Sequence, residues 1–303
     1  MNKIIVLTFT SLLCLFANVT NAFSQDSFII SGNPYAPPVV WEEQRDLSGV
    51  APELVREIFS DLGIGFSTRV ISDWQKVQDK ARAGEIDLIV SAYKNDTRTE
   101  YLNFSVPYLP QPTVIVVEKG KEFKFSSWDS LKGKKGVTGI GESYGQEFDD
   151  FIKNNLDVDY YQLERSLNQL NLGKADYLII DLYTALIYAR LLNGEDQITI
   201  LDPPVTIQDF HLAVQKNSAL NGRLEEINSK LEEKLKNGEI AELFMKQFDR
   251  WKMMIERQSK YLSKYAGERT ADQQAYLEKQ DVMARDRITS LIVDREGLPS
   301  AAQ

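Results

Sequence analysis

At 303 residues, with 43% hydrophobic and 26% charged residues, the chain has the length of two globular domains and the composition of a soluble protein. Its formal net charge of -9 and its lack of any dense block of Lys or Arg argue against a nucleic-acid partner. His211 is the only histidine, so no metal site is expected and this side chain is assigned a structural role.

The N-terminus has the pattern of a secretory signal peptide over residues 1–22. A short basic start, Met1-Asn2-Lys3, precedes the apolar run Ile4–Phe16, and Thr20-Asn21-Ala22 supplies small residues for cleavage. The apolar run is short for a permanent membrane-spanning helix, with an N-terminal anchor as the alternative. Cys14, the only cysteine, lies inside that run, so the mature protein is expected to have neither a disulfide nor a thiol catalyst.

Strand and helix signals alternate in the first part of the mature chain. Apolar residues recur at spacings of three and four in Pro52–Leu62, which predicts an amphipathic helix. Asn33–Pro38 is a proline-rich turn that cannot continue a sheet and leaves Tyr35 on a rigid loop. The other predicted elements are strands at Phe28–Ser31, Phe66–Ile71 and Ile86–Val90 and a helix from Trp74 to Ala81. This alternation favours an α/β fold with a mostly parallel sheet, in which ligands bind beyond the carboxyl ends of the strands.

A second unit repeats this pattern. Gly84–Ser91 and Gly173–Asp181 each contain a glycine, two spacers, an aspartate and an apolar run that ends in a polar residue. The apolar run Val114–Val117, followed by a charged segment, predicts a hinge near Val117, and Asp202-Pro203-Pro204 suggests a crossing back. The elements predicted between and after these points are strands at Gly136–Thr138, Ile198–Leu201 and Phe210–Val214 and helices at about Tyr144–Asn154 and Leu163–Leu170.

These signals predict two lobes and a C-terminal extension. Helices at Leu220–Leu235 and Ile240–Trp251, separated by Asn237-Gly238, close the globular part. Beyond them, charges of both signs interleave around a weak apolar stripe, which predicts a helix. That helix is either a solvated extension packed on the first lobe or a segment that binds a partner or a second copy. The predicted bounds are 23–117 with 208–251 for the first lobe, 118–207 for the second and 252–303 for the extension.

Charged residues near the ends of the two similar strands suggest a site for a zwitterion. Arg98, soon after the first strand, can donate two parallel hydrogen bonds to a carboxylate and stays charged when a cleft excludes water. Asp181, which ends the second strand, can accept from an ammonium group or simply cap the helix that follows. Ser143 opens a helix, where free N–H groups favour a carboxylate, and a plain N-cap explains it equally well.

Aromatic and polar neighbours complete the candidate site. Tyr35, Trp74 and Tyr93 can form aromatic walls, although core packing is the better explanation for Trp74. Ser91, which ends the first of the two similar strands, is the remaining candidate ligand contact. Gly139-Ile140-Gly141 lacks the third glycine of a dinucleotide fingerprint, and the chain contains no Gly-Lys-Ser/Thr phosphate loop. No cofactor is therefore expected.

Taken in order, these motifs resemble the bacterial solute-binding proteins of family 3, the amino-acid-binding components of ABC transporters. The resemblance covers about Phe28–Trp251 and is specific only in combination. Its motifs are Tyr35-Ala36-Pro37-Pro38, Trp74 followed by Gly84-Glu85-Ile86-Asp87-Leu88-Ile89, Arg98 followed by Phe104-Ser105-Val106-Pro107-Tyr108, Leu131-Lys132-Gly133-Lys134, and Asp181. The chain departs from the family's amino-acid-binding members at Tyr93, where a small residue is usual, and at Asn95, where they have Thr or Ser.

The resemblance implies a two-lobed periplasmic-binding fold of type 2. In that fold Arg98 would take the carboxylate of an amino acid or a related compound, Ser143 would assist it, and Asp181 would take the amino group, with Tyr35 packed over the ligand. It further implies a monomeric periplasmic receptor without enzymatic activity. Its lobes would close around the ligand, and a membrane permease would recognise the closed form.

Two other functions stay open at this point. A ligand-sensing module would present its closed state to a membrane signalling protein, with residues 252–303 as a candidate contact. The same fold also resembles cyclohexadienyl dehydratases, for which Glu142 beside Ser143 is the candidate acid. The sequence shows no pair of carboxylates at a defined spacing, which disfavours the enzyme.

Overall fold

The computed structural model describes residues 27–191 and 197–266, together with isolated positions at 271, 275, 278 and 282. The predicted signal peptide, Cys14 and most of the predicted C-terminal extension lie outside the described residues.

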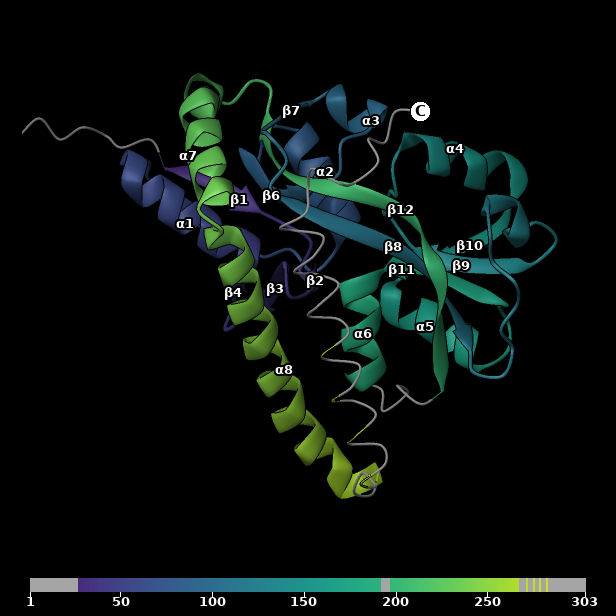
Figure 1. The fold of residues 1–303 in the computed structure, drawn as a ribbon. Helices are drawn as coiled ribbons and strands as arrows, with labels where there is room; N and C mark the ends of the chain where they lie inside the picture. Colours follow the sequence, from purple (N-terminus) through teal and green to yellow (C-terminus); the bar gives the residue numbers. More distant parts are fainter. Residues whose placement is uncertain are drawn as a thin grey trace, which may run out of the picture.

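One nine-stranded sheet runs through the molecule in the order β10-β9-β11-β8-β12-β6-β1-β5, with β7 paired to β12 off this path (Figure 1). In each half the outer strands are parallel, β1 with β5 and β6 in one and β9 with β10 and β11 in the other. The strands are β1 Phe28–Ser31, β5 Phe66–Thr68, β6 Leu88–Ala92, β7 Leu102–Phe104, β8 Leu109–Glu118, β9 Lys135–Gly139, β10 Asp157–Tyr161, β11 Tyr177–Asp181 and β12 Ile198–Gln215. We call the half built on β1, β5, β6 and β7 the first lobe and the half built on β9, β10 and β11 the second lobe.

Two long antiparallel strands, β8 and β12, join the lobes. β8 pairs with β12 from Leu109 to Glu118 and with β11 only from Thr113 to Val116. The prolines Pro110 and Pro112 lie in the segment of β8 that pairs with β12 alone. Because β8 has no strand on its other side there, the missing proline N–H groups cost no hydrogen bond to a second strand. The predicted bounds of the lobes stay a prediction.

The segment that returns from the second lobe to the first differs from the sequence-based expectation. Ile198–Leu201 and Phe210–Val214 were expected as two separate strands, and both belong to the single strand β12. Asp202-Pro203-Pro204 lies inside that strand, where its register against β8 shifts between Leu201 and Thr206. A local run of prolines predicts a break, but the pairing with β8 on either side of it continues the strand.

A second, small sheet corrects another expectation. Tyr35 belongs to the short strand β2 (Tyr35–Ala36), which pairs with β3 (Val40–Glu43) and through it with β4 (Asp46–Ser48). The prolines around β2 keep it out of the large sheet, as expected, but not out of a sheet altogether. Val39, Val40 and Leu47 are fully buried, so this sheet is part of the first lobe's core.

Helices cover both faces of the large sheet (Figure 1). They are α1 Val50–Leu62, α2 Trp74–Arg82, α3 Asp96–Thr99, α4 Gln146–Asn155, α5 Leu163–Asn171, α6 Leu182–Leu191, α7 Leu224–Lys236 and α8 Glu239–Ala266, with short 3-10 helices at Trp128–Leu131 and Ala219–Arg223. The periodic segments predicted as helices therefore form α1, α2, α4, α5, α7 and the first part of α8. Together with the sheet they make the expected α/β two-lobed fold.

Helix α8 joins the predicted helix Ile240–Trp251 to the first residues of the helix predicted beyond it. It continues to Ala266 because neither Gly nor Pro occurs between Gly238 and Gly267. Its first turns pack on α1, α6 and α7, and the ring of Trp251 lies 5.1 Å from that of the buried Trp41. Beyond this contact α8 extends past the body of the protein (Figure 1).

Candidate functional site

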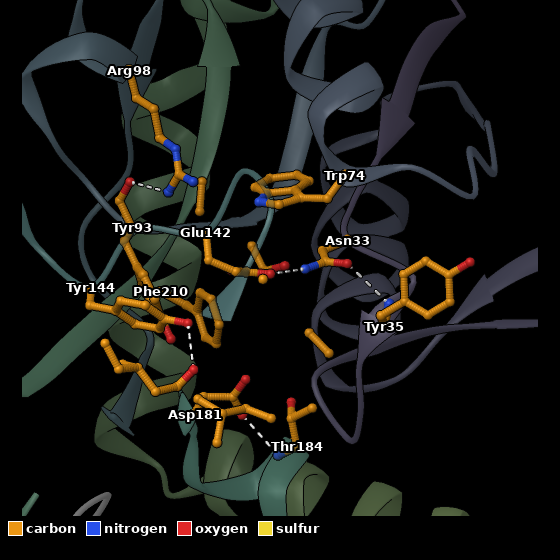
Figure 2. Close-up of a pocket in the computed structure, with 16 residues that line it drawn as sticks. Asn33, Tyr35, Trp74, Tyr93, Arg98, Glu142, Tyr144, Asp181, Thr184 and Phe210 are labelled. Atoms are coloured by element: carbon orange, nitrogen blue, oxygen red, sulfur yellow. Dashed lines mark hydrogen bonds between the residues drawn. The ribbon is translucent and has the colours of Figure 1, made fainter. Parts of the chain in front are cut away.

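A pocket lies between the two lobes, beyond the carboxyl ends of β1 and β6 and of β9 and β11 (Figure 2). Its empty space, counted with the solvent at its mouth, is about 580 Å³. Five of the six predicted ligand-binding residues line it, namely Tyr35, Ser91, Tyr93, Arg98 and Asp181, and the sixth, Ser143, does not. The position matches the rule that ligands of such sheets bind at their carboxyl edge. The roles of these side chains stay predictions.

Arg98 lies on the short helix α3, just after β6, and its side chain is buried. Its Nε donates to Oε1 of Gln78 at 3.2 Å, Nη1 to the carbonyl of Tyr93 at 3.0 Å and Nη2 to the carbonyl of Gly141 at 3.4 Å. Burial lowers the pKa of the guanidinium, and the negative charge of Glu142 opposes this shift. Arg98 thus donates three of its five N–H groups to protein oxygens.

Asp181 ends β11 and caps α6. Its Oδ1 accepts from the backbone N–H of Thr184 at 2.8 Å and from the side-chain amide of Gln111. Burial raises the pKa of Asp181 to about 6, against its hydrogen bonds to Thr184 and Gln111. Asp181 therefore caps α6 and also lines the pocket. The cap does not exclude the second predicted role, that of an acceptor for a ligand ammonium group.

Ser143 and Glu142 precede α4, and of the two only Glu142, the candidate acid of the dehydratase alternative, lines the pocket. The Ser143 hydroxyl accepts from Nδ2 of Asn95 at 2.9 Å and donates to Oδ2 of Asp149 at 2.5 Å, so its side chain is used within the protein. Glu142 is half-buried and lines the pocket, and its Oε1 accepts from Nδ2 of Asn33 at 3.0 Å. Burial, together with the charge of Asp181, raises the pKa of Glu142 to about 7.

Aromatic rings form much of the pocket wall. Tyr93 stacks on Phe210 with ring centroids 4.5 Å apart, and both rings are buried. Trp74 belongs to a buried cluster, as core packing predicts, and also lines the pocket, with its ring 5.4 Å from the Arg98 guanidinium. Tyr35 is half-buried, and its hydroxyl donates to the carbonyl of Ser72. The Tyr93 ring thus forms one wall rather than closing the pocket.

Several pocket residues were not predicted. Asn33 follows the end of β1, so the rule that pointed to Ser91 applies equally to it. Phe210 and Thr184 reach the pocket through the pairing of β12 and the packing of α6, and no local pattern indicates this. His211 stands outside the residues that line the pocket, with Nδ1 2.8 Å from the carbonyl oxygen of Ser105.

Hydrogen bonds join the lobes at the segment 141–143, which precedes α4. Asn33 donates to Glu142, while Gln78 Nε2 and Arg98 Nη2 donate to the carbonyl of Gly141. Asn95 donates to Ser143. Gly141 has a φ of 80°, and a Cβ there would lie 3.1 Å from Oε1 of Gln75 and 3.2 Å from Nε2 of Gln78. Only glycine fits this close approach of the second lobe to α2 without strain.

Neither a metal site nor a membrane-spanning helix is found in the described part of the chain. Among residues 27–191 and 197–266, no group of three or more His, Cys, Asp or Glu side chains is arranged to hold a metal ion. Within the same described part of the chain, every helix is too short or too polar to cross a bilayer.

Comparisons with known proteins agree with this fold. The L-cystine-binding protein TcyJ of Escherichia coli strain K12 is 25% identical over 218 residues, which are 70% of this chain and 79% of TcyJ. The probable histidine-binding protein of Neisseria gonorrhoeae is 26% identical over 184 residues, 58% of this chain and 65% of that protein. The chain thus matches most of the length of TcyJ.

Solved structures are similar as well. A mutant of ArgBP from T. maritima superposes with a TM-score of 0.62 at 23% identity, and AbpA from Streptococcus pneumoniae bound to L-arginine with a TM-score of 0.62 at 19% identity. Each comparison covers 74% of this chain and 95% of the other. The family model of bacterial extracellular solute-binding proteins, family 3, matches residues 28–250. The chain therefore belongs to the bacterial extracellular solute-binding proteins of family 3.

Proposed function

We propose that this solute-binding protein captures an amino acid between its lobes in the periplasm and delivers it to a membrane permease. The observation that carries the proposal is that Arg98 of the first lobe and Asp181 of the second line one pocket. Opposite charges on two lobes fit the two charged groups of an α-amino acid. Both charges can contact the ligand at the same time only when the lobes are close together. Excluding water then strengthens both ionic contacts.

The chemistry of the neighbouring groups supports this orientation. The two N–H groups of Arg98 that donate to no described residue suit a carboxylate. The buried Ser91 hydroxyl lies on the same pocket and has no hydrogen-bond partner within the described part of the chain. Asp181 is oriented by Thr184 and Gln111 through Oδ1. Its other oxygen can then accept from an ammonium group. Ser143 would act on the ligand through its backbone or through Asn95 rather than through a free hydroxyl.

The similar proteins support an amino acid as the solute. TcyJ is named for L-cystine, the Neisseria gonorrhoeae protein for histidine, and AbpA was solved with L-arginine. These solutes share the α-amino and α-carboxylate groups that Arg98 and Asp181 would bind. These solutes differ in their side chains. The side chain of the ligand must therefore be inferred from the residues that line the pocket.

The two crossing strands support a hinge. We place the crossing on β8 at Pro110–Pro112, because β8 pairs with the second lobe's β11 from Thr113 onward. On β12 the crossing would lie near Ile207–Asp209, opposite those prolines. This is slightly earlier on β8 than the hinge near Val117 that the sequence suggests, and it keeps Asn33 and Arg98 on one moving body and Asp181 on the other.

Isothermal titration of the mature chain against a panel of L-amino acids tests the proposal. At least one should bind, and Arg98→Ala should weaken that binding by about thirtyfold or more, because losing a buried charged contact costs about 2–5 kcal/mol. Arg82→Ala is the matched control, since Arg82 lies over the Tyr101 ring outside the pocket. Unchanged affinity in Arg98→Ala would sink the site assignment.

A sensory role is the second candidate, and the reach of α8 beyond the body of the protein favours it. In that case the closed protein would signal to a membrane partner through residues after α8. A chain that ends at Ala266 should then bind its solute normally but fail to evoke a response in cells. Normal uptake and an unchanged response in the truncated chain would exclude the sensory role.

The position of Glu142 in the pocket and its raised pKa support the dehydratase alternative, because a catalytic acid must hold its proton near neutral pH. Incubation with prephenate and arogenate tests it directly. Product formed by the wild type and not by Glu142→Gln would establish the enzyme, and absence of product would remove it.

A further inference from the structure

The charged residues of the pocket do not balance for a zwitterion. Glu142, Asp181 and Arg98 are the charged side chains among the residues that line it, so two negative groups face one positive group. A zwitterion, which has no net charge, would leave one carboxylate without a counter-charge. An uncompensated carboxylate in a closed pocket is costly.

We infer that the pocket selects an amino acid with a net positive charge, and that Glu142 determines this selectivity by facing the cationic group of the ligand's side chain. The inference rests on the proposed function, since it assigns Arg98 and Asp181 to the α-carboxylate and α-ammonium groups. It adds the class of side chain, which neither the family nor the sequence motifs specify.

Arg98 and Glu142 attract each other but form no direct ion pair among the described residues. Among residues 27–191 and 197–266, Glu142 takes part in no ion pair within 4.0 Å, and Arg98 directs three N–H groups to Gln78, Tyr93 and Gly141. The hydrogen bond from Asn33 reaches Oε1 of Glu142 and brings no charge. The second oxygen of Glu142 is thus available to a donor that comes with the ligand.

The raised pKa of Glu142 agrees with this assignment. Burial and the nearby Asp181 disfavour its charged form, while Arg98 and Asn33 act in the opposite direction without overcoming them. A cation placed between Glu142 and Asp181 would favour both charged forms at once. Figure 2 shows the two carboxylates on the same cavity, with Glu142 extended toward Asn33.

The aromatic rings of the pocket suit a cation as well. Trp74, Tyr93, Tyr144 and Phe210 line the pocket with it, and aromatic faces attract ammonium and guanidinium groups. A ligand that instead carried a second carboxylate would meet two negative side chains and be rejected. A neutral ligand would bind with Glu142 protonated. Its affinity would therefore fall at high pH, where Glu142 loses that proton.

The experiment compares L-arginine with its neutral isostere L-citrulline, by isothermal titration at pH 8 with the mature full-length chain. Wild type should bind arginine about tenfold or more tightly than citrulline, since one partly buried ion pair is worth about 1.4 kcal/mol or more. Glu142→Gln should bring the two affinities within about threefold by weakening arginine alone. Glu147→Gln, an exposed glutamate at the start of α4, is the matched control and should change neither affinity.

The outcomes separate this inference from the proposed function. Equal affinity of wild type for both ligands, or an arginine preference that survives in Glu142→Gln, overturns the cation selectivity. The same holds if L-arginine, L-lysine, L-ornithine and L-histidine all fail to bind while a neutral amino acid binds in an Arg98-dependent way. If no amino acid binds at all, or Arg98→Ala has no effect, the proposed function fails as well. A thermal unfolding scan of each variant checks that it is folded.

Discussion

The side-chain amide of Asn33 donates a hydrogen bond of 3.0 Å to Oε1 of Glu142, and this bond joins the end of β1 in one lobe to the loop before α4 in the other. Arg98 makes a second connection of the same kind through the carbonyl of Gly141. The contact between the lobes thus places a titratable carboxylate against a neutral donor. The protonation state of Glu142 therefore affects both the pocket and the contact between the lobes.

The stability of the ligand-free protein should depend on pH through Glu142. Its pKa is raised from 4.5 to about 7, so the folded protein binds this proton more tightly than the unfolded chain does. Its contribution to stability is fully present below about pH 4.5 and is lost as the pH rises through about 7. We expect the unfolding free energy of Glu142→Gln, relative to wild type, to increase by up to about 3 kcal/mol between pH 5 and pH 8. Urea unfolding at both pH values measures this. Asp181 is coupled to Glu142, so the measured difference contains this coupling as well as the titration of Glu142. A difference that does not change with pH would contradict the prediction.

Asp149 should hold the loop that carries Glu142 and Ser143. Its Oδ1 accepts from the backbone N–H of Tyr144 at 2.8 Å, and its Oδ2 accepts from the Ser143 hydroxyl. Asp149→Ala leaves both donors without a partner, so we expect a loss of about 1–3 kcal/mol in unfolding free energy and weaker solute binding. Asp150→Ala is the control, because Asp150 is exposed and, among the described residues, accepts a hydrogen bond only from Gln146 on the same helix. Equal effects of the two variants would show that Asp149 has no such role.

Gly136 should tolerate no side chain. A Cβ at this position of β9 would lie 2.5 Å from Cζ of Tyr177, whose ring is fully buried and cannot move without disturbing the second lobe's core. Gly136→Ala is expected to lower the unfolding free energy by about 1–3 kcal/mol. Gly222→Ala, where a Cβ meets nothing within 4 Å, should stay within about 1 kcal/mol of wild type. Chemical denaturation of both variants provides the comparison, and a neutral Gly136→Ala would mean that the Tyr177 ring can relax.

Trp251 should anchor α8 to the first lobe. Its ring packs on Trp41, and the neighbouring Arg250 pairs with Glu43 at 2.6 Å. Trp251→Ala should destabilise the protein by about 2–3 kcal/mol, less than for a fully buried tryptophan, and should leave solute affinity unchanged. Met253→Ala removes an exposed side chain of the same helix and should cost about 0.5 kcal/mol or less. Thermal unfolding and titration of both variants decide it, and a large loss of affinity in Trp251→Ala would link α8 to the pocket instead.

The sequence by itself determined the elements that depend on local pattern. Apolar spacing in Pro52–Leu62 and in the segment from Trp74 to Ala81 predicted α1 and α2, because the period of a helix is written into neighbouring residues. The alternation of strands and helices implied sheet edges where ligands bind, and this was enough to bring Arg98 and Asp181 into one predicted site. Both line the pocket.

Only the tertiary structure decided which way neighbouring side chains face and which distant segments meet. Ser143 and Glu142 are adjacent, yet the first is used by Asn95 and Asp149 while the second faces the pocket, a difference set by the packing of the lobes. The same is true of Asn33, whose partner lies 109 residues away. Local pattern fixes periodicity, but the partner of a polar group depends on long-range contacts that the pattern does not contain.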